Sequence, residues 1–232
     1  MFFRHSEALW AEHPELVPGV LYAEGINASA DVGAQVARFN AIAASRLAQG
    51  SEGEFPEVQA WRRAFSRMGL KPTQYRCASE SLLRRFRKEN TLPPLHPLVD
   101  LCNAVSLAFA IPIAVFDVAK VSQGLEVRHA IGDEIYLSFG GEVEHPEPGE
   151  VVFADAAEPP KAHARRWTHR QSGLSAVGAG TRSVLIVAEA LHASAAEDVG
   201  RLVSTLAQEL AAAWPTAPRT QLLSRASPCF EF

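Results

Sequence analysis

The segment from residue 98 to residue 117, LVDLCNAVSLAFAIPIAVFD, constrains the fold more than any other part of the chain. It is typical of an apolar helix that runs, without a polar loop, into an apolar strand. One amide, Asn103, and two carboxylates, Asp100 and Asp117, interrupt it. A buried polar group is costly unless it is hydrogen-bonded. Each of the three is therefore expected to have a defined partner, and the partner decides whether the residue is structural or functional.

Composition narrows the class of protein. The 232 residues carry a net charge of −4, so no global basic field is available to hold nucleic acid, and no DNA partner is expected. Any RNA contact must come from a local patch. The N-terminal residues lack a secretion-signal pattern, and no apolar run reaches the ~18 residues of a membrane span. These features predict a cytoplasmic protein without a membrane partner, and the three scattered cysteines are expected to be reduced thiols.

Periodicity and turn residues predict helices first, then a sheet, then one covering helix. Residues 1–19 are interpreted as an irregular lead-in and residues after Pro215 as a loosely attached tail. Helices are expected at 29–49 with Asn27 or Ser29 as the cap, at 56–68, from an N-cap at Ser79, at 98–110, and after a capping box at Ser194–Glu197. Strands are expected at 20–26, 111–117, 125–130, 134–139, 150–156 and 182–191.

This order favours an α+β fold over a parallel βαβ arrangement. The absence of repeats and of low-complexity linkers predicts a single domain. Within it we expect an N-terminal strand and helix over residues 1–54, packed on the same domain, a core over 55–214, and a tail over 215–232.

Several common catalytic devices are missing. The chain has no GxGxxG after a strand, no GxxxxGK[ST], no HExxH, no GxSxG and no CxxC. His163 and His169 lie six residues apart in a predicted loop, which is not a metal-ligand spacing on a helix. Cys102 is interpreted as a small core residue. No metal and no cofactor are predicted.

Two basic runs offer a local patch for RNA. Their cations could bind phosphate groups, or they could simply form two solvated helix faces. The candidate RNA-binding residues are Arg62, Arg63, Arg84, Arg85, Arg87 and Lys88.

An aromatic ring, a guanidinium and an amide lie close together at Trp167, Arg170 and Gln171. This set suits stacking and hydrogen bonding to a base or an amino acid. A structural cation–π contact is the alternative. Glu189 shares one face of its predicted strand with Leu185 and Val187. If that face is inward, Glu189 is a buried carboxylate that is either paired or functional; at the strand end it would be exposed.

Three segments together, VDLCNAVSLAFAIPIAVFD, LEVRHAIGDE and TRSVLIVAEA, resemble the editing (tRNA-binding) domain of the bacterial phenylalanyl-tRNA synthetase beta subunit. That family shows a VD-x-x-N helix, a proline-containing strand ending in F/Y-D, an R-x-A-x-x-G-E strand pair, and a T-x-x-V-L strand with a glutamate. The matching residues are Val99, Asp100 and Asn103; Pro112, Phe116 and Asp117; Arg128, Ala130 and Gly132; and Thr181, Val184 and Leu185. The SESLLRR helix and the R-x-W-x-x-R-Q segment resemble free-standing relatives of the domain.

The resemblance covers roughly residues 55–192 and implies an α+β domain around a β-sandwich of unusual topology, flanked by helices. In the synthetase this domain hydrolyses the ester that joins tyrosine to the phenylalanine tRNA, and it needs neither a metal nor a covalent intermediate. The resemblance implies tRNA, through its aminoacylated acceptor end, as the partner. It makes Asn103, Asp117, Arg128, Thr181 and Glu189 candidates for the pocket. Together with the stacking set, we expect catalytic roles for Asn103, Thr181 and Glu189, and substrate contacts from Asp117, Arg128, Trp167, Arg170 and Gln171.

Two positions depart from the family pattern. The family strand reads P-x-H-x-F-D, and Ala114 stands where its histidine would be. The family glutamate aligns with Val187, and Glu189 lies ~7 Å further along the same face. Three hypotheses follow: a deacylase acting on misacylated tRNA in trans, a non-catalytic tRNA-binding or RNA-binding module, and an amino-acid-like small-molecule binder or hydrolase. A complete aminoacyl-tRNA ligase is not expected, and the sequence does not indicate an oligomeric state.

Overall fold

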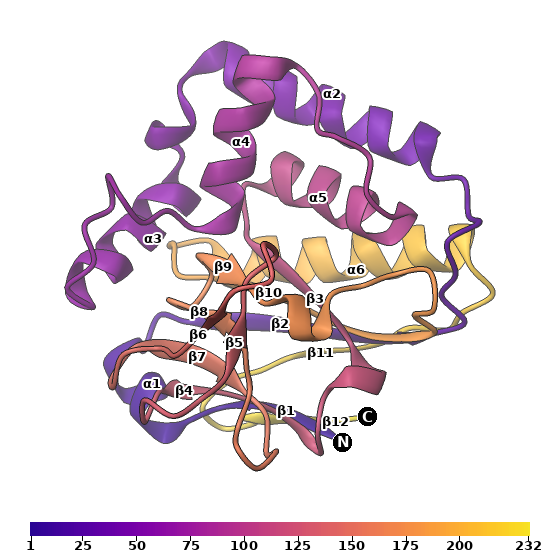
Figure 1. The fold of residues 1–232 in the computed structure, drawn as a ribbon. Coiled ribbons are helices and arrows are strands. Elements are labelled where there is room, and N and C mark those ends of the chain that lie inside the picture. The colour runs from indigo at the N-terminus through magenta and orange to yellow at the C-terminus, as the bar shows by residue number, and fades with distance from the viewer.

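A layer of helices, a four-stranded sheet and a six-stranded sheet are stacked in that order in the computed structural model, which describes all 232 residues (Figure 1). The helices are α1 (Glu7–Glu12), α2 (Gly33–Gln49), α3 (Pro56–Arg67), α4 (Ala78–Glu89), α5 (Pro97–Phe109) and α6 (Ala195–Ala213). The strands are β1 (Phe2–His5), β2 (Val17–Glu24), β3 (Ile113–Asp117), β4 (Gly124–His129), β5 (Tyr136–Leu137), β6 (Val143–Glu144), β7 (Val151–Ala154), β8 (Ala162–Arg165), β9 (Arg170–Gln171), β10 (Ser183–Ala190), β11 (Arg219–Leu222) and β12 (Cys229–Glu231).

The strand order is β12-β1-β4-β7-β8-β9 in the large sheet and β11-β2-β10-β3 in the smaller one, and β5 and β6 form a separate hairpin. β1 runs parallel to β4, and the other pairings are antiparallel. The prediction of a single α+β domain is therefore confirmed. The two stacked sheets supply the β-sandwich, and α2, α5 and α6 cover its four-stranded side.

Strand β10 lies between the two halves of the core. Its even-numbered residues, such as Val184 and Ile186, pack against α2, α5 and α6. Its odd-numbered residues, such as Leu185 and Val187, point into the space between the sheets. Because strand side chains alternate, Glu189 also points between the sheets, as predicted, and it is 2% exposed.

The predicted helix at 56–68 is confirmed, but two predicted N-caps are wrong, and a third, Ser194, has the predicted position without forming the capping box. Asn27 accepts the Ser29 N–H in a local turn, and α2 begins only after Val32. Cys77, not Ser79, caps α4, and Ser79 is buried within the first helical turn. Ser194 precedes α6, but its hydroxyl donates to Asp198 and does not cap a backbone N–H. Ser and Asn side chains can bond to several nearby groups besides the first N–H groups of a helix. The local sequence does not show which of these hydrogen bonds forms.

Both ends of the chain were predicted wrongly. Residues 1–19 contain β1, which pairs with β4 and β12 inside the large sheet, and the helix α1. The residues after Pro215 form β11, which pairs with β2, and β12. The backbones of Met1 and Phe232 exchange hydrogen bonds at the edge of the large sheet. Strands of three or four residues are too short to show a period, so their pairing was not visible in sequence.

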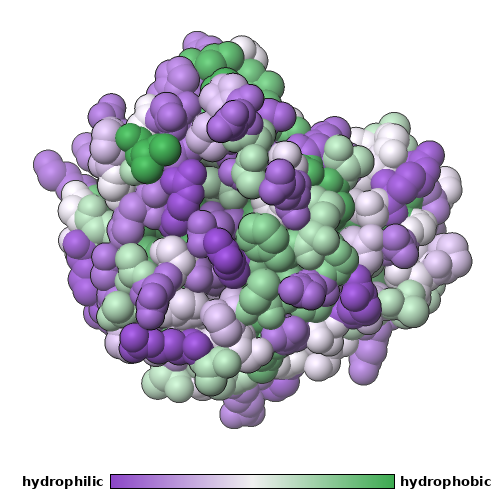
Figure 2. Space-filling view, turned by 90° about the horizontal axis from the view of Figure 1, so that it is seen from below, coloured by the Kyte–Doolittle hydropathy of each residue, from purple (hydrophilic) through white to green (hydrophobic).

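The face opposite the helices carries mainly hydrophilic side chains around a central apolar area (Figure 2). In the whole chain, none of the helices combines the length and the apolar character required to cross a bilayer.

Asp155 fastens the turn that joins β7 to β8. Burial alone would raise its pKa, but the adjacent His163 imidazole and the backbone N–H groups of Lys161, Ala157 and Ser122 stabilise the carboxylate and hold the pKa at about 2. A lowered folded pKa adds stability above the unfolded value of about 3.9, and this stability is lost as pH falls from about 4 to 2.

We therefore expect Asp155→Asn to cost about 2 kcal/mol of unfolding free energy at pH 7 and much less at pH 2.5. Urea unfolding at both pH values measures the difference. An equal cost at both would contradict the role of the carboxylate charge.

Candidate functional site

A cavity of about 470 Å³ lies where the first turns of α5, the strand β3 and the loop 176–179 meet. Its wall is mostly apolar, with a few polar side chains, which is the usual composition of a small-molecule site. Pro97 starts α5, and the helical period then brings Val99, Cys102 and Asn103 to the wall. Ile113 and Val115 face them from β3.

The polar residues of the segment 98–117 have different surroundings, and the buried Ser106 hydroxyl donates to the Ile111 carbonyl at 2.6 Å. Asp100 accepts the Leu95 N–H at 2.9 Å and so shapes the chain that enters α5. Asp117 accepts the Ala119 N–H at 3.2 Å and the Thr181 hydroxyl at 2.8 Å. The amide of Asn103 forms no hydrogen bond within the chain and lines the cavity, half-buried. Asp100 and Asp117 therefore have structural partners, and only Asn103 keeps its donor and its acceptor free for a ligand.

Gln171 supplies a second amide to this cavity. It lies in β9, and its Nε2 donates to the backbone carbonyl of Val115. This bond crosses from the large sheet to β3 and fixes the amide at the wall. The prediction placed Gln171 in a binding site from its neighbours Trp167 and Arg170, and the structure places Gln171 beside the same cavity as Asn103.

His96 lines the cavity and was not singled out in sequence. Its Nδ1 accepts the Leu98 N–H at 3.2 Å, so that His96 caps α5, while its Nε2 has no partner. The ring is 7% exposed, and burial lowers its pKa, although Asp100 opposes the shift. A neutral ring that accepts at Nδ1 carries its proton on Nε2. The only sequence signal was a histidine directly before the proline that starts a helix.

Thr181 and Asp117 support the cavity from behind. The Thr181 hydroxyl donates to Asp117 and accepts the Gly178 N–H at 2.9 Å. Gly178 belongs to the loop that lines the cavity, whereas Thr181 and Asp117 are buried and do not reach its surface. The chain of hydrogen bonds therefore holds the loop 176–179 against β3.

Glu189 and Trp167 lie around a second, smaller cavity of about 50 Å³. Glu189 Oε1 contacts His5 Nε2 at 2.6 Å and accepts the Trp167 indole N–H at 3.0 Å. Ala114 also lines this space, and Gln171 borders both cavities. The structure therefore separates Glu189 and Trp167 from Asn103, on opposite faces of the four-stranded sheet.

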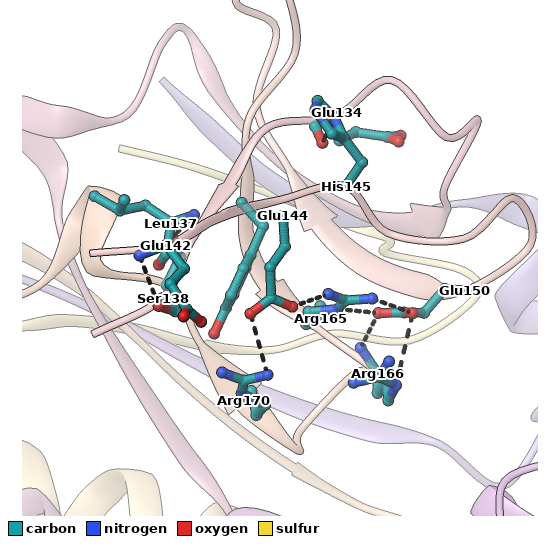
Figure 3. A network of polar contacts seen from close by, with 12 residues as sticks. Glu134, Leu137, Ser138, Glu142, Glu144, His145, Glu150, Arg165, Arg166 and Arg170 are labelled. Atoms are coloured by element: carbon teal, nitrogen blue, oxygen red, sulfur yellow. Dashed lines mark hydrogen bonds and ion pairs between the residues drawn. The ribbon is translucent and has the colours of Figure 1, made fainter. Parts of the chain in front are cut away.

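Arg170 borders the small cavity and belongs to a network of ion pairs around the β5–β6 hairpin (Figure 3). Glu144 lies between Arg165 and Arg170, and Glu150 lies on the other side of Arg165. Burial lowers the pKa of a guanidinium, but the hydrogen bonds from Arg165 to Glu150 dominate and raise it. The network anchors the hairpin to β8 and β9.

The remaining candidates lie away from the cavity. Arg128 pairs with the buried Glu134 beyond β4. Arg62 pairs with Glu80, Arg84 and Arg87 pair with Glu52, and Arg85 pairs with Glu89; Arg63 and Lys88 form no ion pair. Most of the predicted basic patch is thus neutralised, and its RNA-binding role stays a prediction. No three His, Cys, Asp or Glu side chains come together in a way that could hold a metal ion.

The sequence of residues 60–207 matches the family model of the B3/4 domain. The match covers more than half of the chain and includes α5, β3 and β10. The chain belongs to the B3/4 domain family. Every residue that lines the two cavities of this B3/4 domain lies within the matched region, except Ala28 in the loop after β2.

Two known proteins are similar to this B3/4 domain. A phenylalanine--tRNA ligase beta subunit of Cereibacter sphaeroides is 37% identical over 68 residues, which is 29% of this chain and 8% of that protein. The solved N-terminal fragment of the phenylalanyl-tRNA synthetase beta subunit from Pyrococcus horikoshii aligns with 94% of this chain and 50% of that one, at 11% identity and a TM-score of 0.49. The matched segment is a small part of the ligase subunit, and the chain spans half of the solved fragment.

Proposed function

We propose that this B3/4 domain hydrolyses the ester of a misacylated aminoacyl-tRNA in trans. The observation that carries the proposal is the free amide of Asn103 in a cavity of about 470 Å³, in a segment where the side chains of Asp100, Ser106 and Asp117 have partners within the fold. The family resemblance of the chain to a tRNA-editing domain supports the choice of substrate.

The chemistry is a nucleophilic attack of water on the ester carbonyl carbon. The carbonyl oxygen gains negative charge, the bond to the ribose oxygen breaks, and that oxygen takes up a proton. The Asn103 side chain can donate to the developing oxyanion, and the rigid amide of Gln171 can position the substrate beside it. Pre-positioned donors of this kind act without reorganising during the reaction.

Neutral His96 is the second group in the cavity suited to hydrogen bonding. Burial lowers its pKa below the ordinary value, which favours the neutral ring. It is the one imidazole that lines this cavity, in a chain that has Ala114 at the position of the family histidine.

Removal of Asn103 tests the proposal. We expect Asn103→Ala to lower the deacylation rate by roughly 10²–10³-fold, the usual effect of losing one oxyanion donor, with little change in unfolding free energy because the amide has no partner in the fold. The measurement is release of the labelled amino acid from a panel of correctly and incorrectly charged tRNAs. Gln208→Ala, which removes an exposed amide from α6, is the matched control and should keep wild-type activity.

A non-catalytic tRNA-binding module is the second candidate, and Ala114 favours it because it removes a polar side chain from the space beside Glu189. This candidate requires tRNA binding without cleavage of any ester in the panel. Cleavage by the wild type that is retained in full by Asn103→Ala would instead keep the function and reject the proposed site.

A further inference from the structure

Two of the most exposed large apolar side chains flank the mouth of the 470 Å³ cavity. Phe139 is 72% exposed and Leu95 is 70% exposed, and both line the cavity wall. They come from distant parts of the chain, since Leu95 precedes α5 and Phe139 lies in the turn between β5 and β6. Scattered exposed apolar residues are ordinary, but two at one cavity mouth mark a surface that contacts a ligand.

The turn that carries Phe139 is held in place by hydrogen bonds. Within its turn, Ser138 Oγ accepts the Glu142 N–H at 3.1 Å, and the Gly141 N–H donates to the Ser138 carbonyl at 3.0 Å. The hairpin below is fixed to the body by the Tyr136 hydroxyl, which donates to the Gln171 carbonyl at 3.0 Å. The pairing of Glu144 with Arg165 and Arg170 adds a second anchor (Figure 3). A side chain on a fixed turn loses less conformational freedom on binding than one on a mobile loop, because only its own rotamer has to be fixed.

Cations border the opposite wall of the cavity. Lys120 Nζ donates to the Ala176 carbonyl at 2.6 Å, and Arg182 Nη1 donates to the Ala179 carbonyl at 3.2 Å. Both carbonyls belong to the loop that lines the cavity. Lys120 Nζ also lies 3.4 Å from Asp117 Oδ2, whereas Arg182 forms no ion pair. Positive charge is thus available beside the cavity for a phosphate group.

We propose that Phe139, with Leu95 opposite, clamps the terminal base of a single-stranded RNA 3′ end whose ribose enters the cavity, while Lys120 and Arg182 receive the preceding phosphates. The inference rests on the proposed function, because it assigns the base-binding part of the same site. A base presents a flat π-face to an aromatic ring, and such stacking tolerates any base. The ester on the terminal ribose would then lie toward Asn103.

Binding of a short RNA tests the clamp without any ester chemistry. The probe is a four-nucleotide RNA, ACC followed by a 3′-terminal 2-aminopurine, whose fluorescence is quenched when the base stacks. We expect Phe139→Ala to raise the Kd roughly 5- to 100-fold and Phe139→Trp to keep or lower it. Ile131→Ala is the control, because Ile131 is also exposed, at 66%, but does not line the cavity.

A Kd for Phe139→Ala equal to that of wild type, an equal loss in Ile131→Ala, or no quenching by the wild-type protein would each overturn the clamp. A second readout separates it from the proposed function. If the clamp is right, Phe139→Ala raises KM for an aminoacyl-tRNA but leaves KM for an aminoacyl ethyl ester unchanged. If no ester is cleaved yet Phe139-dependent binding is observed, the hydrolase proposal fails and the clamp stands.

Discussion

Replacement of Glu189 by alanine should destabilise the protein by about 2–6 kcal/mol, because each of the two buried polar groups left without a partner costs about 1–3 kcal/mol. The carboxylate contacts His5 Nε2 at 2.6 Å and Trp167 Nε1 at 3.0 Å between the two sheets. Without the carboxylate, the buried His5 and Trp167 side chains lose their shared hydrogen-bond partner. A buried polar group without a partner destabilises the folded state. Urea unfolding of the wild type and of Glu189→Ala measures the difference.

Glu189→Gln is the matched control. Its amide oxygen can still accept the Trp167 N–H, so we expect a loss of about 1–2 kcal/mol. A double-mutant cycle with His5→Ala should give a coupling energy above about 1 kcal/mol. A loss below about 1 kcal/mol for Glu189→Ala would contradict the structural role. Because Glu189 does not line the large cavity, Glu189→Gln should also keep most of the deacylation activity; a loss like that of Asn103→Ala would favour the catalytic role predicted from sequence.

The example of Glu189 shows how far sequence reasoning reached. Strand alternation placed Glu189 on the same face as Leu185 and Val187, and that is correct. Its main partner, His5, lies 184 residues earlier in a four-residue strand. A period of two cannot be recognised over so few residues, so β1, and with it the partner, was interpreted as irregular lead-in.

Around the cavity, too, the sequence predicted the helix and the strand but not the contacts of their polar side chains. The segment 98–117 predicted a helix joined to a strand, and α5 and β3 follow it closely. The distinction among its polar residues depended on contacts made by other segments, such as Thr181 to Asp117 across 64 residues. His96 was hidden for a different reason: a single histidine in a proline-rich loop has no pattern, and its value comes only from its place at the cavity wall.

The neutralisation of the arginines on α3 and α4 could also not be predicted from the local sequence. The arginines of α3 and α4 have the spacing of solvated helix faces or of a phosphate patch. Glu52, from a short turn before α3, pairs with both Arg84 and Arg87 and is almost fully buried. When an acidic residue from another segment pairs with a basic run, the local positive potential of that run is reduced.

Deletion of residues 215–232 should have the largest effect on stability, although this tail was predicted to be loosely attached. β11 pairs with β2, and β12 pairs with β1, so the deletion exposes one edge of each sheet. It also removes Leu223 and Phe230 from the core between the sheets. Burial of each of these side chains contributes about 1.5–3 kcal/mol, before the lost strand hydrogen bonds are added.

The total loss of roughly 5 kcal/mol or more is comparable with the whole stability of a typical domain. We therefore expect the protein ending at Trp214 to lose its cooperative unfolding transition in urea, as measured by circular dichroism.

In the full-length chain, Leu223→Ala and Phe230→Ala should each cost about 2–5 kcal/mol of unfolding free energy. Arg225→Ala, in the exposed turn between β11 and β12, should cost almost nothing. A shortened protein with an unchanged midpoint would mean that the sheets are stable without their edge strands. Its free strand edges would then be open to pairing with other chains, so its apparent stability should be compared at several protein concentrations.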